Sequence, residues 1–259
     1  MRDHKLIRLY IEAPIEIGCF LDCNQDQSHY ISNVMRRKIS DNVLIFNGSD
    51  GEFLANITII HKNGVELKVI KQTREQTYSP EIKLLYAPVK NAKNEFIVQK
   101  ATEMGVSEIQ PINTDRTIRD KANTEKLELV AIEAAEQCKR LDVPQINNIK
   151  EFEHAIDDLQ DYIIIVCDET GKGRAAAEVL AEIKNSNIED EEENFKYAIV
   201  IGPEGGFSPK ELEYLRSLEN VFAIGLGPRI LRAETAIITA LALVQNYLGD
   251  YAISPDFRG

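Results

Sequence analysis

Hydrophobic residues change their spacing near residue 75, and this change divides the sequence into two regions. In the first region, short β-branched and aromatic runs are separated by turn dipeptides such as Asn47-Gly48. Runs of this kind at intervals of about 8–12 residues are typical of a small β barrel or sandwich. We therefore expect strands over 42–46, 53–60 and 65–70, preceded by a short helix over 28–37.

The second region follows a polar stretch at 73–80, which we interpret as a linker, and it alternates strands with helices. Continuous β-branched runs at 162–167 and 197–201 are typical of strands that are buried on both faces. Further strands are expected over 82–87, 106–112 and 221–224, and helices over 93–104, 124–141, 174–183 and 232–248. Such alternation predicts a mostly parallel α/β sheet.

Composition excludes several classes of protein. The chain has 259 residues, of which 44% are hydrophobic and 28% charged, so it can bury one large core or two modest ones without disulfides or metals. The longest apolar run, at 236–244, is too short to cross a membrane, and charges interrupt the N-terminal apolar stretch, unlike a signal peptide. The four cysteines lack a zinc-ligand spacing and are expected to be free thiols in a reducing cytoplasm: Cys19, Cys23, Cys138 and Cys167.

The net charge of −12 weakens an interpretation as a nucleic-acid-binding protein but does not exclude one. Residues 1–75 contain ten basic and ten acidic side chains, so this region is neutral and the deficit lies beyond it. Five consecutive acids at 189–193 account for part of that deficit, and a run of this kind usually forms a solvated loop.

The sharpest local signal is the glycine-rich segment 201–211, which follows a predicted buried strand. Ser208 is a good N-cap, Pro209 fits the first helical position, and Glu211 completes a capping box. Glycines let a ligand approach the backbone closely, and open α/β sheets bind ligands at the carboxyl ends of their strands. The segment therefore indicates a binding loop, although a tight turn without a ligand has the same pattern.

A second glycine-rich segment, 225–236, also follows a short strand and enters a helix. We expect the two loops to lie side by side at one edge of the sheet. Polar Glu204, Arg229, Arg232, Glu234 and Thr235 then stand beside apolar Leu226, Ile230 and Leu231, a mixture that suits a small amphipathic ligand. Neither loop is a Walker A motif or a dinucleotide fingerprint, because the required lysine or third glycine is missing.

GPEGGFS followed by LGPRILRAETA resembles the SPOUT methyltransferases, and among them the RsmE family, which methylates N3 of a uridine in small-subunit (16S) ribosomal RNA. Further matching motifs occur in the same order along nearly the whole chain. They are QKATEMGV at 99–106, DRT at 115–117, EAAEQ at 133–137 with Arg140 and Pro144, and, near the N-terminus, Arg8, His29, 34–36 and Asn47-Gly48.

The resemblance implies an α/β fold of two domains. Residues 1–73 would form a PUA-like RNA-binding β-barrel domain, and residues 74–259 a SPOUT methyltransferase domain with a deep trefoil knot. It also implies a homodimer and the cofactor S-adenosylmethionine. The implied cofactor-binding residues are Gly202, Pro203, Glu204, Gly205, Gly206, Leu226, Gly227, Ile230, Leu231, Arg232 and Thr235.

The implied reaction removes a proton from uracil N3 or stabilises the uracil anion. Arg232 or Arg140 could stabilise charge on the uracil oxygens, and Glu204 could accept the proton or, as we favour, order its loop. No histidine lies in the motif region, so no general base is obvious. The expected RNA contacts are Arg8, Arg36, Arg37, Arg116, Arg119 and Arg140, with the assembled small ribosomal subunit as the better substrate.

Two other functions compete with the methyltransferase. A phosphate-handling enzyme would use the GPEGG loop as an anion-binding nest, but no lysine with serine or threonine follows the glycines. A non-enzymatic RNA-binding or assembly factor would have a degenerate pocket, which the intact LRAETA segment argues against.

Overall fold

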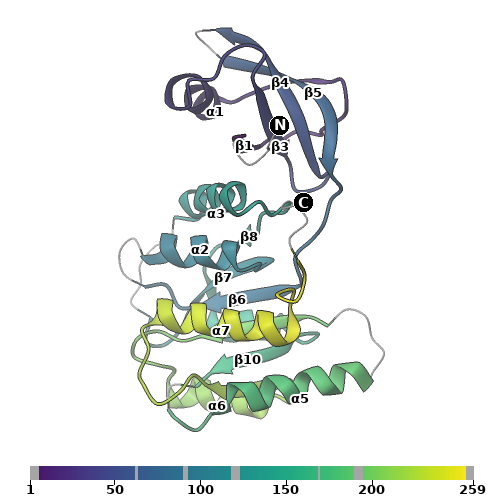
Figure 1. Ribbon diagram of the computed structural model, residues 1–259. Helices are drawn as coiled ribbons and strands as arrows, with labels where there is room; N and C mark the ends of the chain where they lie inside the picture. The colour runs from purple at the N-terminus through teal and green to yellow at the C-terminus, as the bar shows by residue number, and fades with distance from the viewer. Residues whose placement is uncertain are drawn as a thin grey trace. The chain divides into compact units, whose positions relative to one another are not determined.

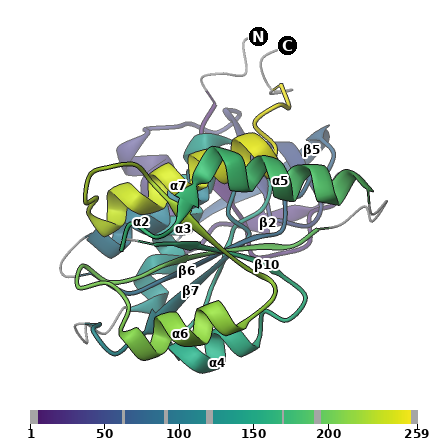
Figure 2. The same ribbon diagram turned by 90° about the horizontal axis from the view of Figure 1, so that it is seen from below.

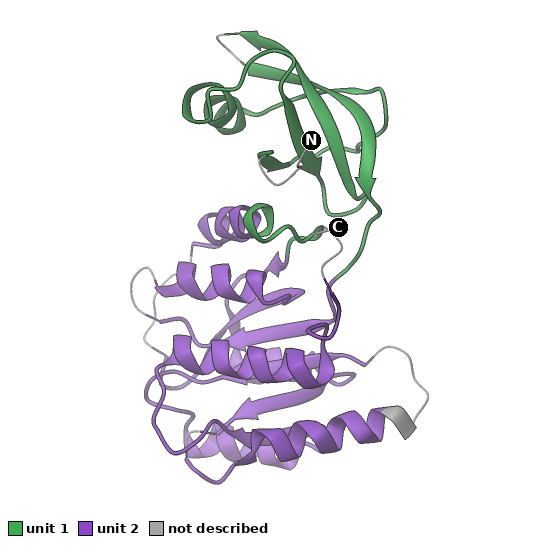
Figure 3. Ribbon diagram, in the orientation of Figure 1, with its two compact units in different colours: residues 1–78, 135–143 green, residues 79–134, 144–259 purple. Residues whose placement is uncertain are grey.

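The computed structural model describes residues 6–61, 64–89, 93–117, 123–168, 170–189 and 195–254. The chain forms two compact units (Figure 3). The first contains residues 1–78 together with 135–143, and the second contains residues 79–134 and 144–259. Arg119 and most of the acidic run at 189–193 lie outside the described residues.

The first unit is built on a five-stranded sheet in the order β1-β3-β4-β5-β2. Strand β1 pairs with β3 in parallel, and the other neighbours are antiparallel. The strand bounds are β1 Arg8–Tyr10, β2 Phe20–Asp22, β3 Asn42–Phe46, β4 Glu52–His61 and β5 Gly64–Arg74. The three predicted strands are confirmed, but β5 continues to Arg74, so the first two residues of the predicted linker belong to the sheet.

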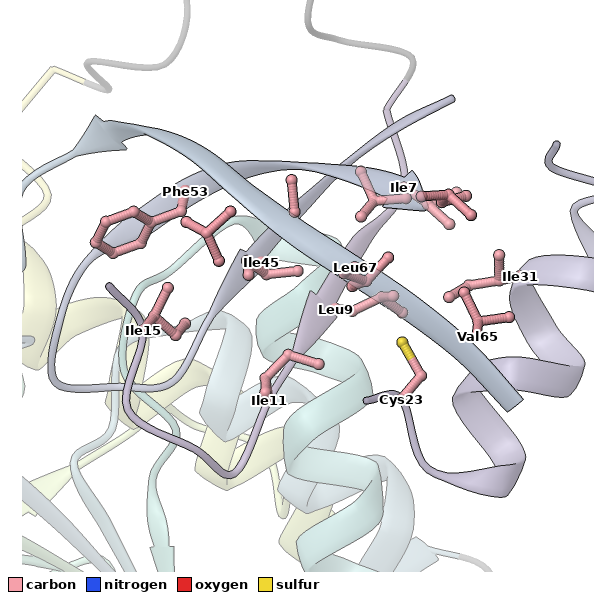
Figure 4. Close-up of a cluster of buried hydrophobic side chains, with 14 residues drawn as sticks. Ile7, Leu9, Ile11, Ile15, Cys23, Ile31, Ile45, Phe53, Val65 and Leu67 are labelled. Carbon is pink, nitrogen blue, oxygen red and sulfur yellow. The ribbon is translucent and has the colours of Figure 1, made fainter. Parts of the chain in front are cut away.

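Alternating side chains of this sheet form one apolar core. Leu9, Ile45, Val65 and Leu67 are buried in one cluster, and Ile31 joins them from the short helical segment (Figure 4). That segment differs from the expected helix over 28–37. An α-helix, α1 (Gln25–His29), begins at a capping box of Asn24 and Gln27 and passes into a single π-helical turn, η2 (Tyr30–Val34).

Residues 135–143 belong to the first unit although they lie far along the chain. They contain the end of α3 (Thr124–Cys138), which stops at Lys139 because this residue adopts a φ of 67°. Ala135 and Leu141 then pack on Phe46 of β3. The predicted helix over 124–141 therefore ends three residues early.

The second unit is a parallel α/β fold, as predicted (Figure 1). Its sheet has the order β11-β13-β10-β12-β6-β7-β8, with β9 also paired to β7, and every pairing is parallel. The bounds are β6 Ile82–Tyr86, β7 Glu108–Asn113, β8 Gln145–Ile146, β9 Lys150–Glu151, β10 Ile163–Cys167, β11 Arg174–Ala175, β12 Tyr197–Ile201 and β13 Val221–Gly225.

Helices cover both faces of this sheet (Figure 2). Helices α2 (Lys93–Glu103), α5 (Ala176–Glu189) and α7 (Ala233–Leu248) lie on one face, and α4 (Phe152–Asp157) and α6 (Pro209–Ser217) on the other. On the α4 and α6 side, Leu85, Val200 and Phe207 belong to one buried cluster. Within the described residues, no helix is long and apolar enough to span a bilayer.

The C-terminal ends of α2 and α7 are fastened together. The buried Gln245 side chain donates from Nε2 to the carbonyl of Met104 over 2.7 Å and accepts from the amide of Asp250. Gly105 follows α2 with a φ of 79°, as expected for a residue just beyond a helix end. The ion pair of Lys93 and Glu234 joins the N-termini of the same two helices, so α2 and α7 run in the same direction. Because α7 follows strand β13, both N-termini lie at the carboxyl edge of the sheet, where the glycine-rich loops emerge.

Candidate active site

The GPEGG loop connects β12 to α6, and the predicted capping box closes its far end. The amide of Glu211 donates to Ser208 Oγ over 3.3 Å, and the amide of Ser208 donates to Glu211 Oε2 over 2.7 Å. Both side chains are buried, and Pro209 occupies the first turn. This reciprocal pair satisfies two backbone donors and sets the position at which the loop ends.

The tip of the loop is a tight backbone turn. The amide of Gly206, whose φ is 67°, donates to the carbonyl of Pro203 over 2.8 Å. Glu204 and Gly205 are exposed at this tip, and the Glu204 carboxylate forms no hydrogen bond within the described chain. The favoured interpretation that Glu204 orders the loop is therefore wrong, because backbone bonds do so and leave its carboxylate available.

The DRT segment after β7 holds the GPEGG loop from the side. The amide of Asp115 donates to Glu211 Oε1 over 2.8 Å, and Ser208 Oγ donates to Asp115 Oδ2 over 2.6 Å. Arg116 reaches further and donates from Nη1 to the carbonyl of Gly205 over 2.7 Å. The sequence analysis singled out both motifs, but nothing in their local patterns indicated that they bond to each other across about 90 residues.

The second glycine-rich loop connects β13 to α7, which begins after Arg232. Gly227 has a φ of 97°, and nothing lies within 4 Å of the position that a β-carbon would take there. The side chain of Ile230 is 97% exposed, while Leu226 and Leu231 are partly buried. The exposed guanidinium of Arg232 makes no hydrogen bond or close ion pair with the described residues.

The two strands that lead into the glycine-rich loops are not immediate neighbours. Strand β10 lies between β12 and β13, so the loop that follows β10 emerges between them. This loop begins at Asp168, whose buried carboxylate accepts from the amide and hydroxyl of Thr170 over 2.8 and 2.5 Å. Sequence reasoning missed Asp168, although a polar residue directly after a continuous β-branched run is a recognisable signal.

An ion pair joins the N-termini of α2 and α7 at the same edge. Lys93 Nζ lies 3.0 Å from Glu234 Oε1, whereas Oε2 is buried and, within the described residues, has no hydrogen-bond partner. Burial raises the pKa of Glu234, but a backbone hydrogen bond and Lys93 outweigh it and lower the pKa overall. Lys93 was not recognised from the sequence, where it is one of many charged residues at predicted helix starts.

The predicted basic residues separate into different environments. Arg116 and Arg232 lie at the carboxyl edge of the parallel sheet, whereas Arg140 belongs to the first unit, where it forms a two-point ion pair with Asp142. Arg36 is exposed with a φ of 50°, and Arg37 is partly buried.

The prediction that Arg8 is an RNA contact is wrong. Its side chain is only 4% exposed, its Nε donates to Glu52 Oε2, and its two terminal nitrogens donate to the carbonyls of Ala135 and Arg140. The guanidinium also lies 3.7 Å from the centre of the Phe46 ring. Arg8 therefore binds the 135–143 segment within the first unit and is not an exposed RNA contact, because all three of its nitrogens are already used.

The residues at the carboxyl edge fit an S-adenosyl compound. Gly205 and Gly227 leave the backbone accessible at both loops, and Leu226 and Leu231 are partly exposed apolar side chains of the second loop. Within the described residues, no group of histidine, cysteine or acidic side chains could hold a metal ion.

Two family models match the chain and show the class of protein to which it belongs. Residues 77–245 match the model of an RNA methyltransferase domain, and residues 24–70 match that of an RNA methyltransferase PUA domain. The chain therefore belongs to the RNA methyltransferase family with a PUA domain.

Two relatives and two solved structures are similar to this chain over most of its length. Ribosomal RNA small subunit methyltransferase E of Rickettsia conorii is 32% identical over 93% of this chain and 96% of its own, and that of Bacillus subtilis is 31% identical over 85% and 87%. A methyltransferase from Legionella pneumophila solved with S-adenosylmethionine superposes with a TM-score of 0.83 at 26% identity, covering 95% of this chain and 99% of the other. The corresponding small subunit methyltransferase E from Neisseria gonorrhoeae, also bound to S-adenosylmethionine, gives 0.81 at 25% identity over the same shares.

Proposed function

We propose that this protein transfers a methyl group from S-adenosylmethionine to N3 of a uridine in 16S ribosomal RNA. The observation that carries the proposal is the meeting of three loops at the carboxyl ends of β13, β10 and β12, two of them glycine-rich and open to a ligand. The relatives named above support the same cofactor and substrate class. The knotted path of the chain implied by the family stays a prediction.

The cofactor supplies an electrophilic methyl group on a sulfonium. The backbone at Gly205 and Gly227 would approach it, and Leu226 and Leu231 would cover its apolar parts. The contribution of the protein is mainly in-line placement of the methyl carbon and the uracil nitrogen, which lowers the entropic part of the barrier. The GPEGG loop can hold its part of this geometry because the capping box and the DRT segment fasten it.

Uracil N3 loses its proton when the new N–C bond forms and the C–S bond breaks. The Glu204 carboxylate is available to accept that proton, and the exposed Arg232 guanidinium to stabilise negative charge on the uracil oxygens. Arg140 stays a weaker candidate because Asp142 already neutralises its charge. Glu204→Gln should therefore lower kcat much more than it changes the KM for the cofactor.

RNA contact is assigned to the exposed Arg36, with Arg37 beside it, and to Arg116. N3 is hidden in a Watson–Crick pair, so the uridine must be unpaired or extruded. We infer that the assembled small subunit in the cytoplasm is the substrate, since a chain with a net charge of −12 binds free RNA weakly. Arg36→Ala should lower methylation of subunits and leave the cofactor affinity unchanged; an equal loss of cofactor affinity would contradict this division of labour.

A homodimer is the proposed working form. Ile230, within the second glycine-rich loop, is 97% exposed, and α7 carries the partly buried apolar side chains of Ile238 and Ala242, one helical turn apart. A second copy of the chain would cover these apolar side chains. Light scattering after size-exclusion chromatography should give the mass of a dimer, and Ile230→Asp should shift it towards the monomer.

The decisive experiment is calorimetric titration of S-adenosylmethionine. A β-carbon at Gly205 meets only Arg116, at 3.5 Å, so Gly205→Val should fold normally and yet lose at least tenfold in cofactor affinity, because the branched side chain blocks the backbone. Heat with ATP but none with S-adenosylmethionine would favour a phosphate-handling enzyme. No heat with either would favour a non-enzymatic RNA-binding factor.

The product is identified separately. Small subunits from a strain that lacks this gene should gain one N3-methyluridine when they are incubated with the protein and S-adenosylmethionine, as measured by mass spectrometry of nuclease fragments of 16S ribosomal RNA. A methyl group on another base or on ribose would contradict the proposed position.

A further inference from the structure

The guanidinium of Arg116 has five N–H donors and uses one of them in a hydrogen bond. Its Nη1 donates to the carbonyl of Gly205 over 2.7 Å, and within the described chain this is its only partner. The side chain is exposed, so the other edge of the planar group stays open to solvent. A single exposed side chain therefore touches the cofactor loop and can bind a second group at the same time.

The backbone beneath Arg116 is held firmly. Asp115 is bonded to Ser208 and Glu211 at the start of α6, through both its amide and its carboxylate. The arginine stem then passes over the loop tip, where a β-carbon at Gly205 would lie 3.5 Å from Cδ and 3.7 Å from Cβ of Arg116. Because the backbone at Arg116 is held in place, a shift of its guanidinium is transmitted to the Gly205 carbonyl and is not taken up by backbone movement at Arg116.

We propose that a phosphate of the substrate RNA binds the free edge of Arg116, and that RNA and the cofactor thereby bind cooperatively. The inference rests on the proposed methyl transfer to RNA and adds a route by which the two substrates affect each other. A guanidinium presents donors on two edges of one plane, so it can bind phosphate and the Gly205 carbonyl together. Phosphate binding fixes the side chain and strengthens its bond to the loop that receives the cofactor.

Thermodynamic linkage makes the proposal quantitative. If RNA tightens cofactor binding by a given factor, the cofactor must tighten RNA binding by the same factor. Couplings of this kind start at about fivefold, which we take as the expected value. Lysine cannot replace Arg116 in this role, because its ammonium is a point charge that binds phosphate but has no second planar edge for the carbonyl.

The test uses equilibrium dialysis of tritiated S-adenosylhomocysteine, which binds like the cofactor but cannot react. Affinity is measured with and without saturating small ribosomal subunits that lack the modification, for the wild type, Arg116→Ala, Arg116→Lys and the control Arg36→Ala. The wild type should bind about fivefold more tightly with subunits. Arg116→Lys should still bind subunits but show a ratio near one, and Arg36→Ala should need more subunits to reach the full wild-type ratio.

Three results would overturn the coupling. The first is a wild-type ratio of one, the second is a wild-type ratio that persists in Arg116→Lys, and the third concerns Arg116→Ala. A uniform loss of affinity in Arg116→Ala with the ratio intact would make Arg116 a purely structural support. Failure of the proposed function looks different, because the wild type would then bind no S-adenosylhomocysteine on its own or transfer no methyl group from S-adenosylmethionine to subunits.

Discussion

Arg8 donates to Glu52 over 2.7 Å, and the two side chains are only 4% and 7% exposed. The same guanidinium donates to the carbonyls of Ala135 and Arg140, at the end of α3. Burial lowers the pKa of Arg8, and the hydrogen bond to Glu52 opposes that shift. This buried pair connects β1 and β4 with a segment about 130 residues away in the sequence.

Removal of Arg8 should destabilise the protein strongly. Arg8→Ala takes the nearest cation from the buried Glu52 carboxylate and leaves it, among the described residues, only the Thr73 hydroxyl at 3.0 Å and Arg74 Nη1 at 3.9 Å. Breaking a buried ion pair in this way costs about 3–5 kcal/mol of unfolding free energy. Urea unfolding followed by circular dichroism measures the change. Glu52→Leu combined with Arg8→Met should lose less than Arg8→Ala alone, since the carboxylate and its nearest cation are removed together and Arg74, 16% exposed, keeps its hydrogen bond to the carbonyl of Lys139. A loss below about 1 kcal/mol for Arg8→Ala would mean that Arg74 or water compensates the carboxylate.

Ser208→Ala should weaken the start of α6. The substitution removes the acceptor for the Glu211 amide and the donor to Asp115, and loss of an N-cap typically costs about 1 kcal/mol. The urea midpoint should fall, and the cofactor affinity should fall with it because the GPEGG loop ends at this residue. Ser217→Ala, at the exposed end of the same helix, is the matched control and should change neither quantity.

Ser40→Gly should stabilise the first unit. Ser40 has a φ of 75°, a conformation that costs an ordinary residue energy and glycine almost none, while its exposed side chain contributes little. Glycine also has more conformational freedom in the unfolded chain, which offsets part of this effect. The expected net increase in the free energy of unfolding is about 0.5 kcal/mol. Ser49→Gly is the control at an exposed serine without positive φ, and it should be neutral or destabilising. Equal effects of the two substitutions would contradict the argument.

The Tyr214 hydroxyl should make stability depend on alkaline pH. Its hydrogen bond to Asp157 and its burial raise the pKa of Tyr214 to about 12, above the value of about 10 in the unfolded chain. The bond therefore contributes fully below about pH 10, and its contribution is lost as the pH rises towards 12. Urea unfolding at about pH 8 and about pH 11 should show a smaller decline for Tyr214→Phe than for the wild type, and parallel declines would refute the assignment.

Local patterns predicted most of the strands and helices. The buried runs at 162–167 and 197–201 became β10 and β12 because continuous β-branched sequence suits strands that are covered on both faces. The capping box of Ser208 and Glu211 formed as expected, since its geometry depends on residues three positions apart. The glycine-rich loops were likewise located correctly, as each directly follows a strand.

Errors arose where a partner is distant in the sequence. Arg8 looked like an exposed cation because its charge could be counted but its carboxylate partner could not be seen. Glu204 was expected to order its loop, whereas Arg116 and a backbone turn do so. The sequence also did not show that β10 lies between the two strands that lead into the glycine-rich loops.

The amino-acid pattern by itself determined the change from a small β-rich region to a parallel α/β region, the positions of most strands and the start of α6, because these depend on spacing and turn chemistry within a few residues. Only the tertiary structure decided that residues 135–143 complete the first unit, that Arg8 is buried, and that the DRT segment supports the GPEGG loop. Those contacts join residues separated by about 45 to 130 positions, and their energy exists only once the chain has brought the groups together.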